Sequence, residues 1–128
     1  MASPTPGKTQ LGVEPNLGGL LCYAPCCVGL IFSIVAVIVE KSNRFVRFHA
    51  FQSLLFHGAW LVVAIALQVA VIVISMISGA LAFIATMLHV VLGLGLFALT
   101  IFLMVKAYGN EEPELPVIGE LARNWANQ

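Results

Sequence analysis

The sequence predicts an all-α membrane protein with three transmembrane helices, an interfacial helix before the second span and a C-terminal amphipathic helix. Hydrophobic residues make up 60% of the 128 residues and charged residues only 9%, whereas soluble domains carry about 25% charged residues. The chain has no Asp, and its net charge is zero. This composition excludes an ordinary soluble enzyme, a disordered chain and a protein that binds nucleic acid through a basic surface.

Two uncharged stretches set the number of spans. One runs from Pro15 to Val39, and the other is the 58-residue stretch from Phe48 to Val105. A spanning helix needs about 20 apolar residues, so the first stretch holds one span and the second holds two. Pro25 lies one to two turns inside the first span, which predicts a kink or a late helix start. We place the spans at about 17–39, 54–75 and 80–105.

The segments outside the spans complete the domain organisation. Residues 1–16, rich in Pro, Thr, Gly and Ser, predict an extended tail that precedes a transmembrane domain over 17–110. Residues 44–51 interleave basic and aromatic side chains, which is typical of a helix at headgroup level leading into the second span. Residues 111–128 predict an acidic turn and then a surface amphipathic helix. Its apolar positions are Ile118, Leu121, Ala122 and Trp125.

The Lys and Arg residues predict the orientation. With three spans, the loop over 40–47 and the C-terminal segment share one side, and the other side carries Lys8 alone. The positive-inside rule therefore predicts a multi-pass protein of the cell inner (plasma) membrane, with its N-terminus outside and its C-terminus in the cytoplasm. The cytoplasmic basic residues are Lys41, Arg44, Arg47, Lys106 and Arg123.

The second and third spans carry matching stripes of small and polar residues. In each span these residues recur every three or four positions and share one helix face. Facing positions of an antiparallel hairpin have a constant numerical sum, which is 157 for these pairs, with its midpoint between Ser78 and Gly79. We expect a hairpin held by small residues and cross-helix hydrogen bonds, including a Gln68–His89 contact. The predicted packing seam consists of His57, Ala64, Gln68, Ser75, Thr86, His89, Gly93 and Thr100.

His89 is the main candidate for a ligand, because it is an ionisable group inside a predicted span. One interpretation is a neutral imidazole bonded to Gln68 in the seam. A second is an axial ligand to haem or chlorophyll, for which Gly93 would leave room, and a third is a proton relay. No other cofactor is expected.

The remaining reactive residues do not form an active-site pattern, so we predict that the protein is not an enzyme. The chain has no Ser-His-acid set and no phosphate-binding glycine loop after a strand. We interpret His49 and His57 as polar anchors near the cytoplasmic interface. The spacing of Cys22, Cys26 and Cys27 is not that of a zinc site, so we expect no metal. These cysteines are expected to pack as small apolar residues, with an intermolecular disulfide or lipidation as alternatives.

Three segments of the chain resemble a widespread bacterial family of small membrane proteins. They are Leu21–Pro25, Asn43–Leu55 and Pro116–Ala122, and the resemblance runs from about residue 20 to residue 122. That family is a domain of unknown function, similar to the channel-type component of the chloroplast inner-envelope Tic import machinery. The chloroplast members are described as four-helix proteins of preprotein import, so the resemblance implies a translocation component without catalytic residues.

The resemblance also implies a contact surface on the cytoplasmic side, although the same residues could instead dock the interfacial helix on the bundle. The surface would consist of Lys41, Arg44, Arg47, His49 and Gln52.

Three functional hypotheses follow. The leading one is a small non-catalytic accessory or stabilising subunit of a larger inner-membrane complex, respiratory, photosynthetic or transport. The alternatives are a Tic-like translocation component acting as an oligomer and a haem- or chlorophyll-binding subunit that uses His89. The expected partners are other membrane-protein subunits and lipid, in an oligomer or a hetero-complex, and no nucleic acid.

Overall fold

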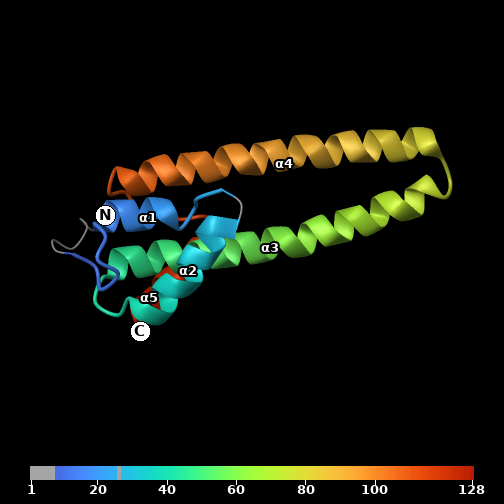
Figure 1. Ribbon diagram of the computed structural model, residues 1–128. Helices are drawn as coiled ribbons and strands as arrows, with labels where there is room; N and C mark the ends of the chain where they lie inside the picture. The colour runs from blue at the N-terminus through green and yellow to red at the C-terminus, as the bar shows by residue number, and fades with distance from the viewer. Residues whose placement is uncertain (1–7, 26) are drawn as a thin grey trace. The chain divides into compact units, whose positions relative to one another are not determined.

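The computed structural model describes residues 8–25 and 27–128, and their regular structure is entirely helical (Figure 1). The chain divides into two compact units, which we call the base unit and the hairpin unit. The base unit contains the described residues up to His57 and those from Thr100 onward, and the hairpin unit is Gly58–Leu99. The helices are α1 (Pro15–Leu21), α2 (Cys27–Val39), α3 (Arg44–Ser75), α4 (Gly79–Tyr108) and α5 (Ile118–Ala126).

The first predicted span is not formed as one helix. Residues 17–39 are divided between α1 and α2. The disruption predicted near Pro25, as a kink or a late helix start, takes the form of a break, since α1 ends at Leu21 and α2 begins at Cys27. The 13 residues of α2 extend about 20 Å, which is short of the about 30 Å of a bilayer core. Only α3 and α4 are long and apolar enough to cross a membrane in the described part of the chain.

The interfacial helix and the second predicted span merge into α3, which runs without interruption for 32 residues. The side-chain oxygen of Asn43 accepts a hydrogen bond from the Val46 amide at 3.2 Å, so Asn43 caps the start of α3. The helix ends at Ser75, and α4 begins at Gly79 after a short turn. The predicted ends of the second and third spans at this turn, residues 75 and 80, agree with these bounds.

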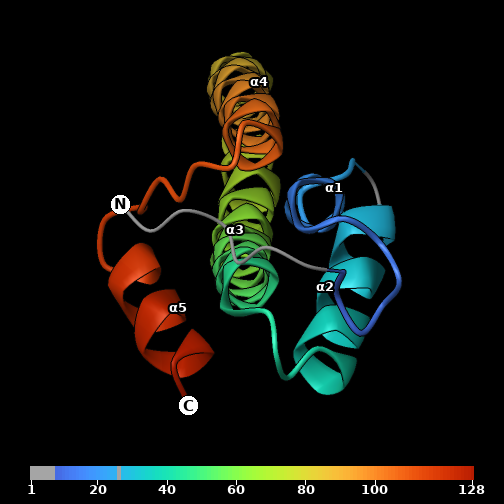
Figure 2. The ribbon, with the colours of Figure 1, turned by 90° about the vertical axis from the view of Figure 1, so that its left-hand side faces the viewer.

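In the base unit, other helices cover the first turns of α3. Figure 2 shows α1 and α2 on one side of α3 and α5 on the other. Glycines bring α1 close to α3, because a Cβ built on Gly18 would lie 3.0 Å from Val46. On the opposite side, the buried residues Ala122 and Ala126 of α5 pack against Phe48.

The C-terminal helix is confirmed, but it docks on α3. The Arg123 guanidinium lies 5.1 Å from the ring centroid of Phe48, and the ring centroids of Phe51 and Trp125 are 5.7 Å apart. Burial against α3 orders this short amphipathic helix, since helices of its length are marginal on their own.

The N-terminal segment folds back as a turn within its described part, and residues 1–7 of the predicted extended tail lie outside the described residues. The Thr9 hydroxyl donates to the Val13 carbonyl at 2.7 Å. The Gln10 amide donates to the Glu40 carboxylate at 2.6 Å. Residue 10 therefore lies beside the loop between α2 and α3. This contact does not fit the prediction that the N-terminal tail and this loop lie on opposite membrane faces, because the chain doubles back through α1 and α2 and brings residue 10 to Glu40.

Candidate functional site

A buried network of hydrogen bonds centred on Gln52 joins three segments of the base unit. The Gln52 amide nitrogen donates to the Tyr23 hydroxyl at 3.0 Å and to the Pro113 carbonyl at 2.9 Å. Its amide oxygen accepts from the Leu115 backbone N–H at 3.0 Å. The side chain of Gln52 is fully buried. One carboxamide therefore ties α3 both to the break after α1 and to the segment after α4.

His49 extends this network by one turn of α3. Its Nε2 lies 3.1 Å from the Glu111 carbonyl oxygen, which accepts only, so Nε2 carries the proton. Its Nδ1 then accepts from the Tyr23 hydroxyl at 3.1 Å. The ring is fully buried and packs edge-on against Phe45 with 4.5 Å between centroids. Both nitrogens are therefore used within the chain, as expected of an anchor rather than a ligand.

The break between α1 and α2 leaves a carbonyl that two serines satisfy. The Cys22 carbonyl accepts hydrogen bonds from Ser33 of α2 at 3.1 Å and from Ser53 of α3 at 2.5 Å. Ser53 also contacts His57 Nδ1, which donates to the Ser53 carbonyl at 2.8 Å. His57 thus bonds within its own helix. These contacts fix the geometry of the break that Pro25 imposes.

Glu40 is a buried carboxylate at the loop between α2 and α3. Besides Gln10, it accepts hydrogen bonds from the Ser42 amide at 3.1 Å, the Ser42 hydroxyl at 2.9 Å and the Asn43 amide at 2.8 Å. Burial on its own would raise the pKa of Glu40. The hydrogen bonds from Asn43, Ser42 and Gln10 outweigh it and hold the pKa below its usual value. The carboxylate therefore acts as an ionised clamp.

Only some residues of the predicted cytoplasmic contact surface are exposed to solvent. Lys41 is exposed and Arg44 is half-buried, whereas His49 and Gln52 are fully buried and Arg47 is 9% exposed. Arg47 donates to the backbone carbonyls of Glu40 at 3.2 Å and of Trp125 at 3.4 Å. The basic-aromatic segment thus docks the start of α3 onto the loop before it and onto α5, which agrees with the alternative interpretation that these residues hold the helix in place. His49 and Gln52 are not available at the surface.

The acidic segment after α4 is paired with basic residues. Arg123 lies 3.2 Å from the almost fully buried carboxylate of Glu112 and also pairs with Glu114. Arg44 lies 3.8 Å from the same Glu112 carboxylate. These contacts fix α5 to the start of α3, so the segment is part of the fold of the base unit.

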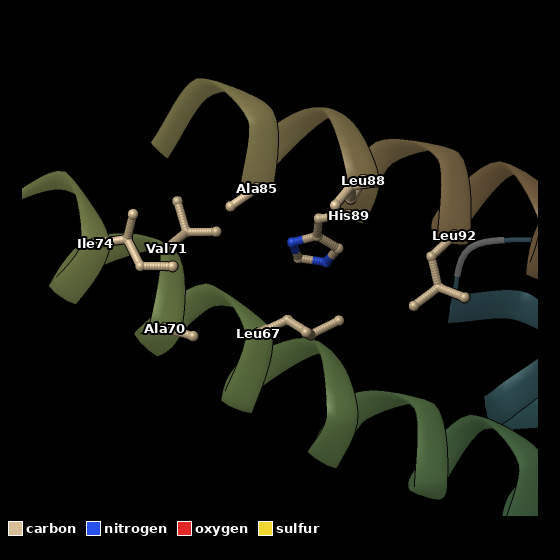
Figure 3. A pocket seen from close by; sticks show the side chains of 8 residues that line it. All are labelled: Leu67, Ala70, Val71, Ile74, Ala85, Leu88, His89 and Leu92. Carbon is tan, nitrogen blue, oxygen red and sulfur yellow. The ribbon is translucent and has the colours of Figure 1, made fainter. Parts of the chain in front are cut away.

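In the hairpin unit, His89 points into a cavity of about 210 Å³ (Figure 3). Its ring lies edge-on to Trp60, with 6.1 Å between centroids. The other residues that line the cavity are apolar: Leu67, Ala70, Val71, Ile74, Ala85, Leu88 and Leu92.

The Gln68–His89 contact is not formed, since no hydrogen bond joins the two side chains among the described residues. Gln68 is exposed, while the neighbouring Leu67 and Val71 are half-buried and line the cavity with His89. The inward face of α3 is therefore rotated by part of a turn from the predicted stripe.

The other predicted seam residues divide between inward and outward faces. Ala64, His89 and Gly93 are half-buried in the hairpin unit, whereas Ser75 and Thr86 are exposed and donate to carbonyls of their own helices. In the base unit, Thr100 is buried and His57 is half-buried.

The cysteines and carboxylates provide no metal centre in the described residues. No group of three or more His, Cys, Asp or Glu side chains that could hold a metal ion occurs there. Cys22 is buried and Cys27 is exposed, both as free thiols, and Cys26 lies outside the described residues. Tyr23 and Glu40, which organise the base unit, were not predicted as site residues.

Comparisons with known proteins place the chain among small membrane proteins. It is 42% identical to a UPF0132 membrane protein of Methanocaldococcus jannaschii, over 94% of this chain and 96% of the relative. A UPF0132 membrane protein of Archaeoglobus fulgidus is 34% identical, over 86% of this chain and 93% of the relative. No solved structure matches. The magnetosome magnetite crystal formation protein family (MamF/MmsF) matches residues 9–122, and the chain belongs to this family of membrane proteins.

Proposed function

We propose that the protein is a small non-catalytic membrane protein that serves as an accessory or stabilising subunit of a larger inner-membrane complex, respiratory, photosynthetic or transport. The observation that supports this role is the network around Gln52. Its polar side chains are bonded to their own chain, as in a structural network. The long helices instead carry many exposed apolar side chains, which are suited to lipid and to other membrane proteins.

Native purification tests this role. The full chain would be extracted in a mild detergent through a C-terminal tag and weighed by native mass spectrometry. A stoichiometric complex with other membrane subunits is expected. Recovery of the chain free of other subunits, under conditions that preserve a known membrane complex from the same cells, would contradict the proposal.

We also propose that the base unit lies at the cytoplasmic face. Lys41, Arg44, Arg47, Lys106 and Arg123 belong to this unit, whereas the turn after Ser75 carries no charge. The positive-inside rule favours this orientation. The Gln10–Glu40 hydrogen bond adds the described N-terminal segment to the same face.

The name of the family associates it with magnetite crystal formation. If the chain takes part in such a process, we propose that it acts as a membrane component and that its acidic segment does not bind iron. The carboxylates of this segment are already paired with basic side chains: Glu111 with Lys106, Glu112 with Arg44 and Arg123, and Glu114 with Arg123. Equilibrium dialysis of the purified protein against iron salts is expected to give no stoichiometric binding. Binding that is lost on Glu112→Gln would overturn this proposal.

One observation favours a second candidate, a haem- or chlorophyll-binding subunit. The His89 side chain points into the cavity and bonds to no polar atom of the described residues. The cavity of about 210 Å³ is below the about 300–1,000 Å³ of most ligand pockets, so a tetrapyrrole would extend outside it. A visible absorption band that disappears in His89→Ala would support this candidate, and a band that persists would remove it.

The Tic-like alternative requires an oligomer, because one hairpin offers too few polar side chains to line an aqueous path. Between His57 and Thr100 the polar side chains are mainly Gln68, Ser75, Ser78, Thr86 and His89. Flux of solutes through proteoliposomes that contain the full chain would support it. Vesicles that stay impermeable at all protein-to-lipid ratios would count against it.

A further inference from the structure

Gln68 is a carboxamide on an exposed face of α3, within the hairpin unit. It lies seven residues before the end of α3 at Ser75, about 10 Å along the helix axis. Its side chain is exposed and makes no hydrogen bond within the described residues. The stretch from Gly58 to Ile74 has no charged residue. In a membrane, this amide would therefore face hydrocarbon without a partner, which is costly for any polar group.

The residues around Gln68 form a stripe suited to helix packing. Leu61, Ile65, Gln68 and Ile72 follow one another at steps of four, three and four, which places them on one helix face. Leu61 is 60% exposed, Ile65 57% and Ile72 54%. We call these four residues the Gln68 stripe. It differs from the face that lines the His89 cavity, which uses Leu67, Val71 and Ile74.

We infer that the Gln68 stripe is a homodimer interface, in which the carboxamides of two copies bond to each other. A carboxamide has both a donor and an acceptor, so two copies related by a twofold axis satisfy each other. Copies that insert in the same direction place Gln68 at the same depth, opposite its equivalent. A lipid tail offers neither donor nor acceptor, and the stripe has no charge to select an oppositely charged partner. This inference is independent of the accessory role.

Self-association of the full chain in lipid vesicles tests the interface. Single-molecule photobleaching across a range of protein-to-lipid ratios would give the dimer dissociation constant. Gln68→Leu is expected to weaken dimerisation about tenfold, in line with about 1–2 kcal/mol for an intramembrane polar contact. Gln68→Asn keeps a carboxamide and should retain much of the affinity. Thr86→Val is the matched control, since the Thr86 hydroxyl already bonds the Ala82 carbonyl of its own helix.

A cross-linking measurement covers the case in which Gln68→Leu alters folding. In a variant without native cysteines, Gln68→Cys and Ile72→Cys should form disulfide dimers under mild oxidation, whereas Thr86→Cys should not. The inference is overturned if the unaltered chain is monomeric at every ratio, or if Gln68→Leu and the unaltered chain dimerise equally. It is also overturned if Gln68→Leu releases a different membrane protein and leaves self-association unchanged.

Discussion

The backbone amide of Gln10 donates a hydrogen bond to the Glu40 carboxylate at 2.6 Å, across 30 positions of the sequence. The Gln10 side chain completes the contact, because its amide oxygen accepts from the Lys41 backbone N–H at 2.7 Å. The two bonds hold the N-terminal turn against the loop that precedes α3. The chain before α3 therefore doubles back through α1 and α2, which brings residue 10 beside residues 40 and 41.

Stability should depend on pH through Glu40. Its pKa is held below the usual value, so the ionised clamp contributes stability above about pH 4.3, the ordinary value for Glu, and loses it as the pH falls through the lowered pKa. Glu40→Gln should cost about 1.5–3 kcal/mol at pH 7, as for other hydrogen bonds to charged groups. The cost should shrink below pH 4. Thermal unfolding in detergent followed by circular dichroism measures it. The exposed Glu120 provides the control Glu120→Gln, and a Glu40→Gln cost that is equal at pH 7 and pH 3.5 would contradict the prediction.

The Gln52 network should be essential for the stability of the base unit. Gln52→Leu leaves the Leu115 amide, the Pro113 carbonyl and the Tyr23 hydroxyl without this partner, and each buried unsatisfied group costs about 1–3 kcal/mol. We expect a clear fall in the unfolding midpoint in detergent. Gln68→Leu makes the same substitution at an exposed position of the same helix, so at monomeric dilution it should leave the midpoint unchanged. Equal effects of the two variants would refute a structural role for Gln52.

Tyr23→Phe removes a hydroxyl that accepts from Gln52 and donates to His49. The aromatic ring remains, so the expected loss of about 1–2 kcal/mol reports the hydroxyl alone. Tyr108 is exposed, and Tyr108→Phe is the matched control. Chemical denaturation of both variants would check this, and a Tyr23→Phe protein as stable as the parent would mean that the network does not depend on this hydroxyl.

Gly19→Ala should disturb the contact of α1 with its neighbours. An added Cβ would lie 2.9 Å from the Phe45 ring, 3.1 Å from His49 and 3.2 Å from Ala107. Overpacking of this kind costs about 1–3 kcal/mol. Gly95 has no atom within 4 Å of such a Cβ, so Gly95→Ala should be neutral or stabilising by up to about 1 kcal/mol. A shift of the unfolding midpoint in the same direction for both variants would contradict this packing.

Residue types and their spacing predicted where most of the helices lie. Long uncharged stretches mark α3 and α4, and Pro25 marks the break before α2, because proline cannot continue a helix. The stripe at Ile118 and Trp125 marks α5. These features are local, so they can be read from spacing and residue type.

The polar contacts depend on distant parts of the chain and were less predictable. Tyr23, Gln52 and the carbonyl of Pro113 meet only after α1 docks on α3, and no sequence spacing encodes that. The predicted Gln68–His89 pair came from matching polar residues across the hairpin. Half-buried apolar residues instead set the inward face of α3, since packing of Leu67 and Val71 beside His89 decides the rotation of the helix.

Site-specific labelling tests most directly whether the α3–α4 hairpin crosses the membrane with the base unit on one side. Single cysteines at Lys8, Ser78 and Gln128, in a variant without native cysteines, would react with a membrane-impermeant maleimide in sealed vesicles of both orientations. Lys8→Cys and Gln128→Cys should react from the cytoplasmic face and Ser78→Cys from the opposite face. Labelling of Lys8→Cys from the same face as Ser78→Cys would contradict the account, because α1 and α2 would then form a third crossing.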